Sequence, residues 1–324
     1  MIGDGMGSAQ IYAALTVKKD KLNIARCKYI GLVKTYSADD YVTDSAAGAT
    51  AFATGKKTNN GFLNVDPNGA RLTTILEISE NHGLSTGLVA TCSVTHATPA
   101  GFIAHTKDRD DNERIALDFL KTDVDVFIGG GYKFFIKRHD KLNLIDSLKK
   151  RNYIIAGSLS DLEKIHSGKI AGLLYDEQPP EISYCRGEML RLASLKATEI
   201  LDKNDKGFFL MIEGSQIDWG EHKKNIDYTL SETLDFDNVV GNMLDFAEND
   251  GETLVIITAD HETGGLTLPG GSLKNETVKA KFSTRNHTGV WVPVFAFGPG
   301  AEEFTGVMEN TDIFNKMIML YGFN

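Results

Sequence analysis

Cysteine and proline are both scarce in this sequence. Its 324 residues include 3 cysteines and 7 prolines. Cys27, Cys92 and Cys185 are odd in number and have no CxxC spacing, so neither a disulfide framework nor a zinc ribbon is indicated, and we interpret them as structural thiols. No linker rich in proline, serine or glycine divides the chain, and no internal repeat is visible. We therefore expect a single domain over residues 1–324.

Long apolar runs and an excess of basic residues are also absent. No uninterrupted apolar stretch reaches about 18 residues, so an ordinary transmembrane helix is not expected. The formal net charge of −10 argues against nucleic-acid binding, which needs a surplus of Lys and Arg. No signal peptide is visible, but the opening Met1-Ile2-Gly3-Asp4-Gly5 reads like the end of a strand. We expect the natural chain to begin upstream of it.

What the sequence does contain is a regular alternation of short apolar runs and segments with helical spacing. We predict strands at residues 87–91, 124–128, 208–212, 254–258 and 292–297. We predict helices at residues 72–81, 114–121, 189–201, 230–247 and 312–320. This alternation predicts an α/β protein with three layers, α/β/α, around a largely parallel central sheet.

Polar residues follow several of these predicted strands directly. Glu213 comes after the run 208–212, the pair Asp260-His261 follows the run 254–258, and His96 comes soon after the run 87–91. In open α/β sheets, ligands bind outside the carboxyl ends of the strands, where loops from separate strands meet. We therefore expect these polar clusters to point into one crevice.

Three of the clusters have residue types that suit a metal ion. Asp218 and His222 are four residues apart, which places both on one face of a helical turn and suits a zinc-type ion, although a solvated surface pair is the alternative. Asp260 and His261 are adjacent, and two glycines that follow them allow the loop needed for both to ligate one ion. His287 offers another imidazole, with a packing or capping role as the alternative.

Asp4 and Ser45 each lie where a turn or a helix is expected to begin. Asp4 is at a strand end that opens into a tight turn, and an ordinary Asp-Gly turn is the alternative. Ser45 opens a run of small residues that predicts a short helix, whose free N–H groups and dipole favour an anion. No histidine is near Ser45 in sequence, so metal coordination is the expected means of activating it. Arg109 suits bidentate recognition of phosphate, if it is not an isolated surface residue.

Taken together, these clusters resemble the alkaline phosphatase family, in order from residue 2 to the C-terminal strand and helix. The formylglycine signature of sulfatases is not found. The motifs that carry the resemblance are Ile2-Gly3-Asp4-Gly5-Met6-Gly7, Asp44-Ser45-Ala46-Ala47, His96-Ala97-Thr98-Pro99-Ala100, Glu213-Gly214 with Ile217-Asp218 and His222, Ala259-Asp260-His261-Glu262-Thr263, and His287-Thr288-Gly289 before Val292-Pro293-Val294.

The resemblance implies hydrolysis of phosphate monoesters through a phosphoserine on Ser45, with Arg109 as the phosphate clamp. It also implies two zinc ions and a third ion, usually magnesium. The implied ligands are Asp218, His222 and His287 for the first zinc; Asp4, Asp260 and His261, with Ser45 beside them, for the second; and Asp4, Thr98 and Glu213 for the third ion.

Two positions that face the substrate in the family depart from a well-known bacterial pattern. His96 and Trp219 stand where that pattern has Asp and Lys, and animal enzymes have His at both. The segment between His261 and His287 is short, about 25 residues, which indicates a compact version of the fold. The resemblance further implies a homodimer and a periplasmic or extracellular location. The alternatives are a phosphodiesterase or phosphonate hydrolase on the same scaffold, or a non-catalytic protein that binds metal or phosphate.

Overall fold

The computed structural model describes residues 1–19 and 21–323, and its centre is a six-stranded parallel sheet. The strand order is β5-β6-β4-β3-β7-β1, and every pairing within this sheet is parallel. The strands are β1 (Ile2–Gly3), β3 (Ser85–Ser93), β4 (Val126–Gly130), β5 (Tyr153–Ala156), β6 (Lys169–Leu173) and β7 (Phe208–Gly214).

A second sheet of four strands continues the first. Its order is β14-β2-β13-β8, and β13 runs antiparallel to both of its neighbours. A parallel bridge between Ile2 and Thr258 joins the two sheets, and the Gly3 N–H donates to the Thr258 carbonyl at 2.9 Å. The strands are β2 (Tyr29–Lys34), β8 (Val255–Ile257), β13 (Val292–Phe297) and β14 (Gly306–Glu309).

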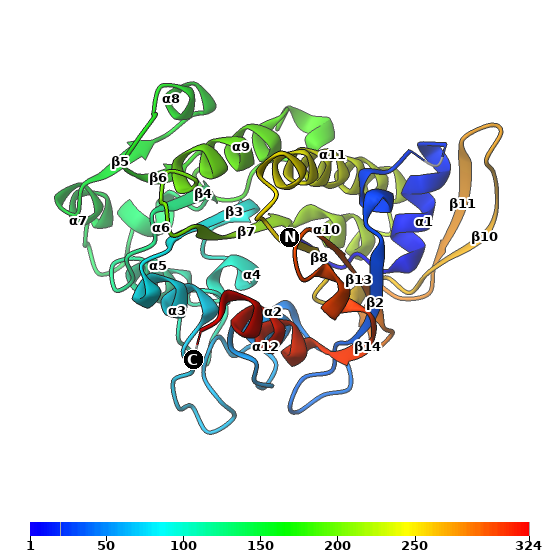
Figure 1. Ribbon diagram of the computed structural model, residues 1–324, viewed down its shortest axis with the longest axis horizontal. Coiled ribbons are helices and arrows are strands. Elements are labelled where there is room, and N and C mark those ends of the chain that lie inside the picture. Colours follow the sequence, from blue (N-terminus) through cyan, green and yellow to red (C-terminus); the bar gives the residue numbers. More distant parts are fainter. Residues whose placement is uncertain (20, 324) are drawn as a thin grey trace.

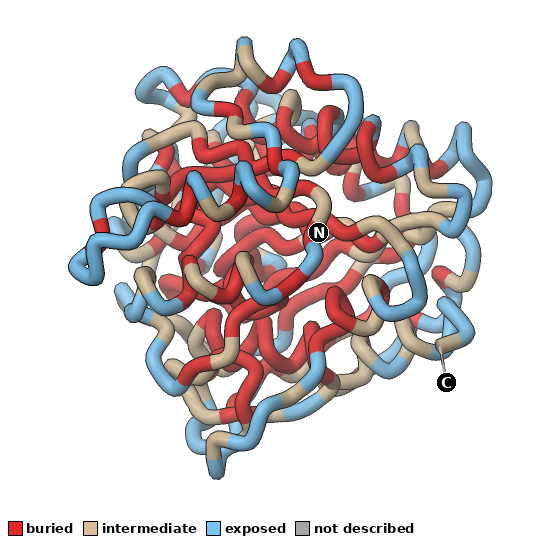
Figure 2. Tube along the Cα trace, turned by 90° about the vertical axis from the view of Figure 1, so that its left-hand side faces the viewer, coloured by how far each residue is buried: buried red, intermediate tan, exposed pale blue. Residues whose placement is uncertain are grey.

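Helices cover both faces of the sheet, so the predicted three-layer α/β/α fold is confirmed. In Figure 1, α9 and α11 lie on one side of the strands, while α2, α3, α4 and α12 lie on the other. Buried residues gather along the strands between the helices (Figure 2). These helices are α2 (Ser45–Thr54), α3 (Ile75–His82), α4 (Ala97–Ala100), α9 (Met189–Leu201), α11 (Ile226–Asp250) and α12 (Asn310–Tyr321).

The five predicted strands correspond to β3, β4, β7, β8 and β13, and the bounds of β13 are those predicted. Four predicted helices overlap α3, α9, α11 and α12, and the predicted helix at 114–121 overlaps α5 (Asn112–Asp118). The short segment between His261 and His287 holds a hairpin of β10 (Leu266–Ser272) and β11 (Thr277–Phe282), which packs against α1 (Ser8–Val17) (Figure 1). Within the described residues, no helix combines the length and apolarity needed to cross a bilayer.

A cavity of about 610 Å³ lies alongside β7 and β8. Phe208, Leu254 and Met317 are among the residues that line it. The polar clusters that follow these two strands lie at the carboxyl ends. None of those polar residues is among the residues that line the cavity.

Candidate active site and metal centre

The predicted polar residues meet at the carboxyl ends of neighbouring strands. Ile2 of β1 pairs with Glu213 of β7, which brings Asp4 beside the end of β7. Gly5 follows with a φ of 77°, and its N–H donates to Asp260 Oδ1 at 3.2 Å. A Cβ on Gly5 would lie 2.5 Å from the carboxylate of Glu221, so this turn requires glycine. The turn holds Asp4 next to the loop that follows β8.

Asp218, His222 and His287 form the first group of metal-binding side chains. Asp218 and His222 both lie on α10 (Gln216–His222), and one atom from each of the three lies within 4.8 Å of the others. Nε2 of His222 is 3.2 Å from one Asp218 oxygen, and Nε2 of His287 is 3.6 Å from the other. The Nδ1 atoms of the two histidines donate to the carbonyls of Arg285 and Thr43. Each Nε2 therefore presents a lone pair to the group.

His261 is the centre of the second group. Its Nε2 lies 3.3 Å from Ser45 Oγ, 3.2 Å from Asp260 Oδ2 and 3.5 Å from Asp4 Oδ1. All four side chains are buried. The ring of His261 also stacks on that of His287, with centroids 3.5 Å apart, so the first and second groups are in contact.

The tautomer of His261 follows from a chain of hydrogen bonds. Thr263 Oγ1 donates to Asp218 Oδ1 at 2.5 Å, because a carboxylate only accepts. The same hydroxyl oxygen lies 3.2 Å from His261 Nδ1 and accepts its hydrogen. Nε2 of His261 therefore carries a lone pair, and it faces two carboxylates and the Ser45 hydroxyl. Such an arrangement of electron-rich atoms is repulsive unless a cation lies among them.

The distances between these atoms fit a bound metal. Four ligands at about 2.0–2.1 Å in a tetrahedron stand roughly 3.3 Å apart. The pairs around Asp218 and around His261 are 3.2 to 3.6 Å apart. Among the described residues, both oxygens of Asp4 and Oδ2 of Asp260 are buried and have no hydrogen-bond partner. The residues present therefore fit divalent cations of the zinc type.

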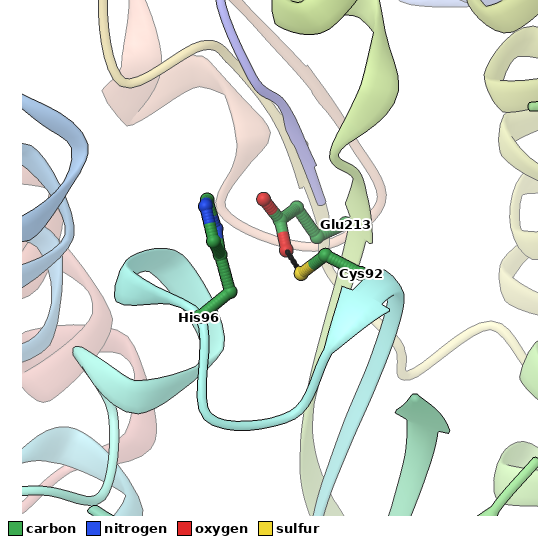
Figure 3. A group of neighbouring side chains, drawn as sticks. All are labelled: Cys92, His96 and Glu213. Atoms are coloured by element: carbon green, nitrogen blue, oxygen red, sulfur yellow. Dashed lines mark hydrogen bonds between the residues drawn. The ribbon is translucent and has the colours of Figure 1, made fainter. Parts of the chain in front are cut away.

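A third group lies at the ends of β7 and β3. Oε1 of Glu213 and Oγ1 of Thr98 are buried and, within the described residues, have no hydrogen-bond partner. Cys92 and His96 also face Glu213, and the ligand atoms of these three lie within 4.8 Å of one another (Figure 3). Buried acceptors without donors are rare in folded proteins, which indicates that a cation belongs here as well.

The electrostatics of the site point in the same direction. Burial raises the pKa of Asp4, raises that of Asp260 to about 6 and raises that of Glu213 to about 7. Burial also acts to raise the pKa of Asp218, but the neighbouring side chains of His222, His261 and His287 lower it overall. Several carboxylates are thus held where their anionic forms are destabilised, and bound cations supply the compensating charge.

Ser45 begins the predicted short helix, which is α2 in the structure. Asp44 caps this helix, since its side chain accepts from the Ala47 N–H at 2.9 Å. Gly48, one turn into the helix, lies so close to Asp260 that an added Cβ would be 3.1 Å from the Asp260 Cβ. Asp44 also accepts from Arg109 Nη1 at 2.8 Å, which holds the guanidinium near Ser45. Ser45 is therefore fixed between the metal ligands and an arginine.

His96 and Trp219 lie together beside the third group. Their rings meet edge to face, with centroids 5.9 Å apart. Burial lowers the pKa of His96 to about 4, so this imidazole is neutral near pH 7. Neither residue adds a positive charge to the place where a phosphate would bind.

Every site residue predicted from the sequence lies in this region, and three further residues were missed. Thr263 and Asp44 stand inside recognised motifs, but their role in orienting His261 and Arg109 appears only in three dimensions. Cys92 was interpreted as a structural thiol, and it faces Glu213, which is 121 residues away in sequence. Its position three residues before Thr95 and four before His96 was the only signal available.

Comparisons with known proteins agree with this geometry. The family model described as alkaline phosphatase matches residues 1–281 and 272–322. Alkaline phosphatase 4 of Bacillus subtilis is 33% identical, and the match covers 96% of this chain and 86% of that protein. The alkaline phosphatase of Escherichia coli is 32% identical, with 98% and 84% covered. The Bacillus match runs over 396 aligned positions against 324 residues here, so that relative has insertions that this chain lacks.

Solved structures are similar throughout the chain. The alkaline phosphatase of the Antarctic bacterium TAB5 matches with a TM-score of 0.96 and 44% identity, covering 100% of this chain and 97% of that one. A mutant of the TAB5 enzyme, with a TM-score of 0.96 and 42% identity over 100% of this chain and 96% of that one, is described with Mg bound in its M3 site. From the shared fold, the converging ligand groups and these matches, the chain is an enzyme that belongs to the alkaline phosphatase family.

Proposed function

We propose that this enzyme hydrolyses phosphate monoesters through a phosphoserine on Ser45, assisted by two zinc ions and a third ion, magnesium in the family pattern. The observation that carries the proposal is the lone pair of His261 Nε2, which faces Asp4, Asp260 and Ser45 at distances expected between ligands of one ion.

Three groups of side chains would hold the ions. Metal ions in such a site stabilise charge on the attacking and leaving oxygens and make water more acidic. The proposed ligands are Asp218, His222 and His287 for the first zinc; Asp4, Asp260, His261 and Ser45 for the second; and Asp4, Thr98 and Glu213 for the third ion.

The residues of the chain perform the bond changes as follows. Arg109, oriented by Asp44, binds phosphate oxygens, while the N–H groups at the start of α2 face the same anion. Ser45 Oγ attacks phosphorus, the bond to the leaving oxygen breaks, and the alcohol departs with the serine proton. Water then attacks phosphorus, the bond to Ser45 breaks, a proton from the water returns to Ser45 Oγ, and phosphate is released. Two in-line displacements leave the configuration at phosphorus unchanged.

The Ser45→Ala variant tests the covalent step. We expect it to lose most turnover of an aryl phosphate while elemental analysis shows the metal content of the unmodified protein. An acid-quenched reaction of the unmodified enzyme should yield a phosphorylated peptide that contains Ser45. Full turnover in the variant would refute the proposed nucleophile. Activity on a bis-aryl diester above that on the monoester would favour the phosphodiesterase alternative.

Chelation tests the role of the metals. We expect a chelator to abolish turnover and added zinc with magnesium to restore it, because the orphaned oxygens of Asp4, Asp260 and Glu213 have no hydrogen-bond partner within the described residues. A cation held at about 1,000 times its Kd stabilises the folded state by about 4 kcal/mol, so the melting temperature should fall with activity. The control is chelator saturated with zinc beforehand. Turnover that survives exhaustive chelation would contradict the proposal.

We also propose that the protein is exported to the periplasm or the medium and acts as a homodimer. Both expectations rest on its membership of the family. Sedimentation velocity of the metal-loaded protein measures the second, and fractionation of the host cells measures the first.

A further inference from the structure

Cys92 places a thiol next to the proposed third ion. It lies near the end of β3 and is fully buried. Its Sγ is 3.4 Å from Glu213 Oε2 and 3.2 Å from the Ser93 carbonyl, so its single hydrogen has two acceptors to choose between. Four residues along the chain, the ring of His96 stands opposite the Glu213 carboxylate (Figure 3). Sulfur, nitrogen and oxygen atoms from the three side chains lie within 4.8 Å of one another.

Two atoms of this group have no partner within the described residues. Oε1 of Glu213 and Nδ1 of His96 are both buried and form no hydrogen bond. The Glu213 side chain has no exposed surface at all. One oxygen of this buried carboxylate faces a thiol, while the other oxygen and the adjacent imidazole nitrogen have no partner within the described residues. This is the arrangement of ligands around an ion rather than of a packed core.

We propose that Cys92, His96 and Glu213 bind a thiophilic divalent cation, zinc before others, as the third ion of this enzyme. The proposal rests on the proposed function only in that Glu213 is shared with the magnesium ligand set. Binding converts the Cys92 thiol to a thiolate, which forms the metal–sulfur bond, and the proton passes to solvent.

The choice of ion follows from the chemistry of the donors. Magnesium prefers six oxygen ligands in a near-octahedral arrangement and binds sulfur poorly. Thiolate, imidazole and carboxylate together favour zinc, whose bonds of about 2.0–2.3 Å give a tetrahedron with edges of roughly 3.3–3.8 Å. The distance of 3.4 Å between Cys92 Sγ and Glu213 Oε2 falls within that range. Because Glu213 belongs to both sets, zinc and magnesium compete, and we expect this chain to discriminate against magnesium at the third position.

Cobalt is the direct probe of the metal–sulfur bond. The full chain is stripped with a chelator and reloaded with three equivalents of Co²⁺. We expect a thiolate-to-cobalt charge-transfer band in the near ultraviolet, and we expect Cys92→Ala to lose it. In parallel, zinc titration should show a third equivalent bound by the unmodified protein. Cys92→Ala should bind that third equivalent more than about tenfold more weakly.

Two other cysteines provide matched controls. Cys185→Ala removes an exposed thiol and Cys27→Ala removes a buried one away from the site, and both should keep the band. Cys92→Ser retains the size of the side chain and should also lose the band, so a folding defect of the alanine variant does not decide the result. A cobalt protein without the band, or a band that persists in both Cys92 variants, would overturn the proposal.

The test of Cys92 as a metal ligand can be separated from the test of catalysis. Full turnover with two zinc ions and magnesium, and no charge-transfer band, would leave the phosphatase proposal standing and remove Cys92 as a ligand. A band that depends on Cys92 in a protein without turnover would establish the metal site and contradict the proposed function.

Discussion

Nη1 of Arg109 donates a hydrogen bond of 2.8 Å to Oδ2 of Asp44, the residue immediately before Ser45. The same carboxylate caps α2 through Ala47 and accepts from the Gly61 N–H at 2.9 Å. One partly buried carboxylate thus sets both the start of the helix that carries the nucleophile and the position of the guanidinium that would bind phosphate. Two functions that sequence reasoning treated separately depend on a single side chain.

Asp44→Asn tests this coupling. Asparagine still caps the helix through its oxygen, but it removes the charge that holds Arg109. We expect KM for an aryl phosphate and the inhibition constant for phosphate to rise about 10-fold, with a small change in kcat. Asp111→Asn is the matched control, because Asp111 caps α5 in the same way, through the Arg114 N–H. Equal effects from the two variants would show that only capping matters.

Thr263→Val tests the orientation of His261. Valine has the shape of threonine without the hydroxyl that donates to Asp218 and accepts from His261 Nδ1. We expect zinc affinity to fall by about 10–100-fold, as is usual when a partner of a metal-bound histidine is removed. Thr263→Ser should restore most of it. Zinc affinity is the decisive measurement, since a purely structural role would lower stability and leave affinity unchanged in the folded fraction.

The sequence predicted the location of the site better than its internal connections. Continuous apolar runs marked β7 and β8 because both are largely buried, and the polar residues directly after them had to lie at the carboxyl end of the sheet. The helical spacing of Asp218 and His222 also follows from sequence alone. The contacts between individual side chains do not follow from sequence alone. Cys92 and Glu213, for example, are in contact although they lie on separate strands.

Elements with exposed faces were harder to predict. β2 has two exposed residues at its start, and β10 and β11 form a hairpin whose side chains are mostly exposed or only partly buried. Their hydrophobic patterns are weak because solvent, rather than the core, is in contact with them. The antiparallel direction of β13 was also outside the reach of the pattern, since its partners β2 and β8 are distant in sequence.

Trp219→Lys tests the missing positive charge at the phosphate position. Trp219 meets His96 edge to face, and neither side chain carries charge near pH 7. We expect the unmodified enzyme to release phosphate readily and the lysine variant to be inhibited by phosphate more strongly, because an ammonium group attracts the anion. Tyr184→Lys adds the same charge at an exposed aromatic residue in η2 (Ile182–Tyr184) and serves as the control. Unchanged phosphate inhibition in Trp219→Lys would count against the interpretation.

Glu80 gives the fold a pH dependence that is independent of the metal site. Its carboxylate accepts from the Asp123 N–H at 3.1 Å and from Thr86 Oγ1 at 3.3 Å, with the charges of Asp123 and Lys169 nearby. Burial raises its pKa from 4.5 to about 7. The folded protein therefore holds this proton more tightly than the unfolded chain, and the stability that it contributes is lost as pH rises from 4.5 through 7.

Glu80→Gln removes this titration and keeps the shape of the side chain. Relative to the unmodified protein, the variant should gain free energy of unfolding between pH 5 and pH 7 and show a constant difference above about pH 8. Urea denaturation of both metal-loaded proteins across this range measures the difference, and the contributions of the metal ligands cancel because they are common to both. Glu163→Gln on α8 (Leu159–Glu163), at an exposed position, is the control and should show a difference that does not vary with pH. If the difference in free energy of unfolding for Glu80→Gln were also independent of pH, the Glu80 carboxylate would titrate alike in the folded and unfolded chains, and the prediction would be wrong.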